Sequence, residues 1–173
     1  MSLEEGRSAA IKINKISNDE LEGGEEVVLT EEEINSYLHY VYAEELPDGI
    51  RGMRVRFRED MANVRGYVDL AKLAENGGGP GGFLLMLFRG EREMDARVRY
   101  VSSNGEARVD VESLKLDGRE MKGRLLDWLV NTYVSPNMDG FALGEPTPMG
   151  HNIDQIKLEF GRAVVTATER TAD

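Results

Sequence analysis

Four arginines lie close together in the sequence at spacings that suit the binding of an anion. Arg54, Arg56 and Arg58 alternate with apolar residues, and Arg65 follows on the next expected strand. Alternate residues of a strand point to one face of a sheet, so these side chains are expected to form one basic strip. Guanidinium groups bind carboxylates and phosphates through paired hydrogen bonds. The strip therefore predicts a site for an acidic head group. The competing interpretation is that another strand or the acidic N-terminal leader neutralises it.

A second set of residues could bind an apolar ligand. Residues 83–88 are apolar at every position, and periodicity leaves open whether they form a strand or a helix. A helix is expected over about 119–134, with apolar side chains on two of its faces. Such surfaces line a ligand groove in some proteins and fill the core in others, and both interpretations stay open. The residues of this predicted ligand site are Phe83, Leu85, Leu87, Leu125, Trp128 and Leu129, with Arg54, Arg56 and Arg58 beside them.

The sequence contains no pattern that is typical of a catalytic or metal site. The absence of cysteine excludes thiol nucleophiles, disulfides and cysteine-ligated metals. His39 and His151 are far apart, and no Gly-x-Ser-x-Gly segment is present. The glycine of 137–140 comes too early for a calcium loop, and the glycine-rich stretch 76–82 lacks the Gly-Lys-Ser/Thr of a phosphate loop. We therefore expect no catalytic residue, no metal and no cofactor.

The charge of the chain is acidic and unevenly distributed. The net charge is −11, and residues 1–33 hold ten acidic and three basic side chains. Binding to the phosphate backbone of nucleic acids needs a basic footprint, so a nucleic-acid partner is not expected. Strong attachment to an anionic lipid surface is disfavoured for the same reason. No apolar run approaches the roughly 18 residues of a membrane-spanning helix.

The chain is expected to form one domain over 27–167. Residues 1–26 predict an acidic flexible leader or a weak first strand, and 168–173 a polar tail. A helix is predicted over about 30–42, because Thr30 and Glu33 have the spacing of a capping box.

Three hairpins are predicted from turn residues and alternating polarity. The first turns at 59–60, and the last covers 153–167 around Gly161. The middle one turns at Asn104–Gly105, a dipeptide suited to a two-residue turn. That turn sets Arg99 opposite Asp110 and Arg97 opposite Glu112, and a change of apolar parity predicts a bulge near 112–113. Together these elements predict an α+β fold: a strongly curved antiparallel sheet of about six to seven strands that wraps one long helix, with a second helix at one side.

The order of elements resembles that of a known group of domains. The capped segment Leu29–Leu38 comes first, meandering strands and an apolar helix follow, and a hairpin with Gly161, Ala163 and Val165 ends the domain. This plan is similar to the tubular lipid-binding (TULIP-like) superfamily and to bacterial lipoprotein-type domains of unknown function. The resemblance covers roughly 25–167. It implies an extracytoplasmic, non-catalytic domain with an apolar groove and a membrane tether through a removed N-terminal segment.

The leading hypothesis is therefore a non-enzymatic, periplasmic or otherwise extracytoplasmic domain. It would hold a lipid or another amphipathic molecule between sheet and helix, and arginines would orient the acidic head. Two alternatives stay open. One is an interaction module with a solid core and no ligand, and the other is a hydrolase whose site assembles only in the folded chain. A cytoplasmic location is the alternative to the extracytoplasmic one, and the sequence leaves the oligomeric state open.

Overall fold

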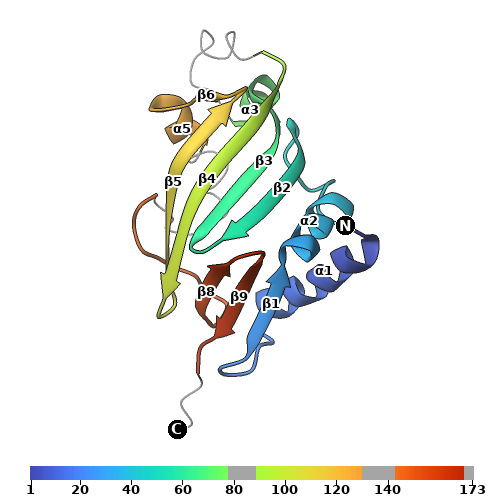
Figure 1. Cartoon of the computed structure of the whole chain (residues 1–173), viewed down its shortest axis with the longest axis vertical. Helices are drawn as coiled ribbons and strands as arrows, with labels where there is room; N and C mark the ends of the chain where they lie inside the picture. Colours follow the sequence, from blue (N-terminus) through green and yellow to red (C-terminus); the bar gives the residue numbers. More distant parts are fainter. Residues whose placement is uncertain (78–88, 130–142, 170–173) are drawn as a thin grey trace.

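Two antiparallel sheets and four helices form the part of the protein that a computed structural model describes, residues 1–77, 89–129 and 143–169. The larger sheet has the order β2-β3-β4-β5-β6, with β7 paired to β5, and the smaller has the order β1-β9-β8. Helices α3 and α5 lie at one end of the larger sheet, and the smaller sheet with α1 and α2 lies at the other (Figure 1). The predicted α+β class and antiparallel pairing are confirmed, but the strands are divided between two sheets. The elements are α1 Leu3–Ser17, β1 Glu26–Thr30, α2 Glu31–Tyr40, β2 Ile50–Arg58, β3 Met61–Asp69, α3 Leu70–Gly77, β4 Glu91–Ser103, β5 Glu106–Leu116, β6 Arg119–Glu120, α5 Arg124–Leu129, β7 Thr147–Pro148, β8 Ile153–Glu159 and β9 Arg162–Ala167.

The N-terminal segment is helical, so the expectation of a flexible leader or weak first strand over 1–26 is wrong for α1. Ser2 caps this helix, because its hydroxyl accepts a hydrogen bond from the Glu5 N–H at 3.2 Å. Gly6 and Ala9, three residues apart, are its buried positions. The small size of these two residues lets α1 pack closely on α2, and Ile16 near the end of the helix packs on a buried cluster that includes Leu21 and Val27.

The capping box predicted for the next helix is confirmed. The Thr30 hydroxyl accepts from the Glu33 N–H at 3.1 Å, and the Glu33 carboxylate accepts from the Thr30 N–H at 2.9 Å. The helix ends at Tyr40, two residues before the predicted end. Residues 26–30 form strand β1, which the sequence analysis did not predict, and pair with β9.

The three predicted hairpins are present, as β2–β3, β4–β5 and β8–β9. In the middle hairpin Arg99 lies opposite Asp110, as the turn predicted. The register shifts at Arg97, which lies opposite Ser113, so the predicted Arg97–Glu112 pair is wrong. The shift is itself the bulge predicted near 112–113.

The return strand β3 ends at Asp69, and helix α3 follows without a loop. This helix is not among the elements expected from the sequence. The Asp69 carboxylate accepts from the N–H groups of Ala71 and Lys72, which is the capping that starts the helix. Leu70 and Leu73, three residues apart, are fully buried on one helical face.

The helix expected over 119–134 is changed at its start. Residues 119–120 form the short strand β6, and α5 begins at Arg124, because the turn at 117–118 folds the chain back onto β5 first. Residues 130–134 lie outside the described part of the chain. Trp128 packs on a buried cluster at the α3 end of the larger sheet, which consists of Val68, Leu70, Leu73 and Leu116.

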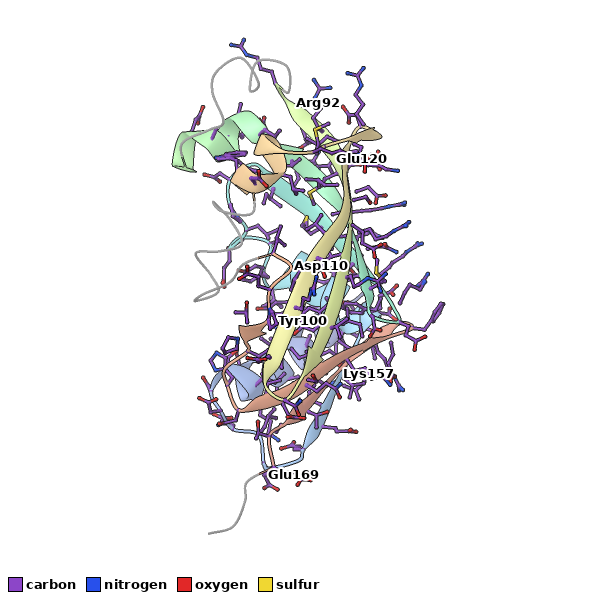
Figure 2. All side chains as sticks on the ribbon, turned by 90° about the vertical axis from the view of Figure 1, so that its left-hand side faces the viewer. Arg92, Tyr100, Asp110, Glu120, Lys157 and Glu169 are labelled. Carbon is purple, nitrogen blue, oxygen red and sulfur yellow. The ribbon has the colours of Figure 1, made fainter. Side chains whose placement is uncertain are left out.

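The two faces of the larger sheet differ sharply in polarity. Val55, Phe57, Val64 and Val98 point to one side, which we call the inner face, and residues between them point to the outer face. At one end the inner face packs on α3 and α5, and at the other end Phe57 packs on the smaller sheet. The outer face carries long charged side chains, several of which end in nitrogen and stand side by side on the right of Figure 2.

Candidate anion-binding face

The arginines of the predicted strip are held by a strand that is anchored on both edges. Strand β2 pairs with β3 along one edge. Along the other edge, the Asn35 side chain of α2 accepts from the Val55 N–H at 2.7 Å and donates to the Val55 carbonyl at 2.8 Å. The Glu31 carboxylate accepts from the Phe57 N–H at 3.0 Å. Because α2 closes the open edge of β2 in this way, the residues around Arg56 have a fixed backbone from which to project.

Cross-strand pairing places further polar residues beside these arginines. Arg56 lies opposite Asn63, and Asn63 in turn lies opposite Arg97 on β4. Arg54 lies opposite Arg65, a like-charge pair that destabilises a sheet. We call the resulting surface the basic face. It lines a hollow of about 400 Å³ and consists of Arg54, Arg56, Arg58, Asn63, Arg65, Asp95, Arg97, Ser113 and Lys115.

The basic face carries six cationic side chains and one carboxylate. The carboxylate of Asp95 accepts from the Arg65 Nε at 2.8 Å. Arg58 donates to its neighbouring carbonyl, and its guanidinium lies 4.3 Å from the ring centroid of Phe160. Within the described part of the chain, five of the cations have no ion pair: Arg54, Arg56, Arg58, Arg97 and Lys115.

The acidic N-terminal region reaches the rim of the basic face. Glu5, Glu31 and Glu32 line a neighbouring hollow of about 780 Å³ together with Arg54, Arg56 and Arg58. These three carboxylates are bonded elsewhere, to the Ser36 hydroxyl, the Phe57 N–H and the N-terminal amine respectively. In residues 1–77, 89–129 and 143–169, none of them forms an ion pair with a basic-face arginine.

The residues predicted to bind one ligand lie on opposite sides of the larger sheet. Arg54, Arg56 and Arg58 are on the outer face, whereas Trp128 packs on the cluster beneath the inner face. Leu125 and Leu129 belong to α5, and the structure does not describe their side chains. The predicted residues Phe83, Leu85 and Leu87 lie outside the described residues.

The two histidines are not brought together. His39 is exposed on α2 and meets Tyr40 edge to face, with 4.6 Å between the ring centroids. His151 Nδ1 lies 3.7 Å from the Asp19 carboxylate.

The segment 137–140, considered above as a calcium loop, lies outside the described residues. In the ranges that are described, no group of three or more acidic or histidine side chains is placed to hold a metal ion, and no helix is long and apolar enough to span a membrane.

Sequence reasoning missed Asn63, Arg97, Ser113 and Lys115 as members of the basic face. The alternation of β3 indicated that Asn63 and Arg65 share a face, but the pairing of β3 with β4 joins strands separated by residues 70–90. No turn motif fixes that register. Arg97 was also assigned a carboxylate partner, which the bulge in β5 removes.

Comparison of the chain with protein-family models, with curated proteins and with solved structures finds no match.

Proposed function

We propose that the protein is a non-enzymatic binding domain that holds an anionic ligand on the basic face. The observation that carries this proposal is the presence, in the described part of the chain, of four arginines and one lysine without ion pairs around one hollow. They occur in a chain whose net charge is −11. A sequence so rich in carboxylates could neutralise this surface with few substitutions, so a basic face is best explained by an anion that it binds.

The physical chemistry of the surface supports a ligand of compact charge. Guanidinium groups stay protonated at all physiological pH values and form paired hydrogen bonds with oxyanions. Exposed charges act over about 8 Å at physiological ionic strength, so an anion at the face responds mainly to the nearby arginines. A long polyanion would also meet the acidic remainder of the protein. Small or compact anions are therefore favoured.

The test is a thermal-shift panel of compact anions, each compared with sodium chloride at matched ionic strength. At a hundredfold excess over its Kd, a bound anion should raise the Tm of the wild-type chain by about 5 °C or more. Arg56→Glu should abolish that rise, because it places a carboxylate at the centre of the face. Arg7→Glu is the matched control. It makes the same charge change on α1, where Arg7 is exposed and lies outside the hollow.

Two results would overturn the proposal. One is that no anion in the panel raises the Tm beyond the chloride control. The other is that Arg56→Glu and Arg7→Glu reduce the rise equally, since the effect would then follow net charge instead of the face.

A second candidate function follows from the inner face. Val64, Ala96, Val98 and Val111 are only half-buried, and they lie between the cluster beneath α3 and the cluster against the smaller sheet. This band supports the expected binding of a lipid or another amphipathic molecule between the sheet and a helix. As part of this second proposal, the sheet would be strongly curved and would wrap a long helix. The protein would also be extracytoplasmic. The arginines would not orient the head of such a ligand, because they project from the opposite face.

Native mass spectrometry of the purified chain tests this second candidate. A co-purified apolar ligand that is released by Val98→Glu and retained by Arg56→Glu would support it. If the wild-type chain has only its sequence mass, the inner face is covered by the protein itself, and the alternative of a solid core is correct.

A further inference from the structure

Three neighbouring rows of side chains on the outer face of the larger sheet differ in how their charge is neutralised. The first row runs from Arg54 through Arg65 and Asp95 to Lys115, and Arg65 is paired with Asp95. The third contains Arg99, which binds the carboxylate of Glu112 on β5 at 2.5 Å. Both rows therefore contain a carboxylate bound by an arginine.

The middle row has no carboxylate. It runs from Arg56 through Asn63 and Arg97 to Ser113. The position between the two arginines, where a carboxylate would stabilise the sheet most, is held by the amide of Asn63. An aspartate at position 63 would have nearly the same shape and would pack equally well. With asparagine there instead, neither guanidinium group has a carboxylate partner within its row.

We infer that the middle row is a binding site for a phosphate group, which would lie above Asn63 between Arg56 and Arg97. This inference rests on the proposed function and gives its ligand a chemical class. Neighbouring strands are about 4.8 Å apart, so the backbones of the two arginines are separated by about 10 Å across β3. Both side chains are long enough to reach inward to one group midway between them.

The donors around this position suit a tetrahedral dianion better than a carboxylate. A carboxylate is planar, and a single guanidinium can bind both of its oxygens. Here two arginines flank the Asn63 amide, one on each neighbouring strand. A phosphate presents oxygens in several directions and can accept from both guanidinium groups and from the amide.

Isothermal titration of the full chain with inorganic pyrophosphate, and separately with citrate, tests the inference. Citrate carries its charge on carboxylates. Pyrophosphate should bind at least tenfold more tightly than citrate, and Arg97→Gln should weaken pyrophosphate at least fivefold. The decisive variant is Asn63→Asp. It should weaken pyrophosphate at least tenfold and should also raise the urea midpoint of unfolding, because the new carboxylate lies between two arginines. Asn104→Asp, the same change at the tip of the β4–β5 hairpin, should alter neither quantity.

Three outcomes would overturn the inference: equal affinity for citrate and pyrophosphate, unchanged pyrophosphate binding in Asn63→Asp, or a lower urea midpoint in that variant. Each leaves the proposed function intact if anions still raise the Tm of the wild type but not the Tm of Arg56→Glu.

A further experiment identifies the source of the phosphate. Competition of pyrophosphate by vesicles that contain phosphatidic acid, and not by phosphatidylcholine vesicles, would indicate a lipid head group. Competition by neither would indicate a soluble phosphate ligand.

Discussion

Replacing Glu33 with glutamine is expected to lower the free energy of unfolding by about 3 kcal/mol at pH 7. This carboxylate is only 9% exposed and joins three elements. Its Oε1 accepts from Lys12 of α1 at 2.6 Å and from the Ser8 hydroxyl at 2.8 Å, and its Oε2 accepts from the Thr30 N–H. Lys12 also donates to the Val28 carbonyl of β1. Glutamine would leave the partly buried Lys12 ammonium without its counter-charge.

The same carboxylate should make the protein sensitive to acid. Burial raises the pKa of Glu33, but hydrogen bonds from Lys12, from the Thr30 N–H and from Ser8, with the charge of Lys12, outweigh it and lower the pKa from 4.5 to about 2. The unfolded chain therefore binds the proton first as the pH falls. The stabilisation is complete above the ordinary value of 4.5 and is lost as the pH falls towards about 2.

Urea unfolding of the wild type and of Glu33→Gln at several pH values measures both effects. The difference between the two proteins should be largest at neutral pH and should shrink between pH 4.5 and 2, the range set by the two pKa values. Glu22→Gln is the control. Glu22 is exposed, so its loss should cost less than about 0.5 kcal/mol. A difference that stays constant with pH would show that Glu33 acts through packing and not through its charge.

Gly6→Val is expected to destabilise the protein by about 3 kcal/mol, through the contact between α1 and α2. A Cβ atom at Gly6 would lie 2.9 Å from the backbone oxygen of Ser36 and 3.1 Å from its carbonyl carbon. Those atoms belong to the interior of α2 and cannot rotate away. Ser36 is itself completely buried, so the helices would have to separate to admit a side chain.

Circular dichroism during urea unfolding gives the free energy of this variant. Arg7→Val is the matched control, because it places the same side chain at the adjacent, exposed position of α1. That change should cost less than about 1 kcal/mol, mainly from the lower helix propensity of valine. Equal losses in the two variants would mean that α1 does not pack closely on α2.

The features that could be predicted from the sequence are those that depend on residues only a few positions apart. Thr30 and Glu33 are three residues apart, and the Asn104–Gly105 turn sets its own register, so the helix start and the hairpin were predicted in detail. Even the bulge in β5 was visible as a change of apolar parity.

Features that depend on distant partners were missed. Residues 1–26 looked like a flexible leader or a weak strand because of their charge and of Gly23–Gly24, and the buried residues of α1, Gly6 and Ala9, are small. Their value appears only when α2 lies against them. For the basic face, the strip of Arg54, Arg56 and Arg58 was predicted, and its position on the outer face agrees with the alternation of β2. Its completion by residues of β4 and β5 required a register that no local motif sets.

The most direct test of the central claim is the mapping of backbone amide signals by ¹H–¹⁵N NMR during titration with inorganic pyrophosphate. We expect saturable shifts that are largest at Arg56, Asn63 and Arg97 and absent from the smaller sheet, and we expect no shifts when the same titration is made with Arg56→Glu. Shifts that centre on another surface would contradict the assignment of the basic face as the ligand site, and the absence of saturable shifts in the wild type would contradict the assignment of the middle row as a phosphate site.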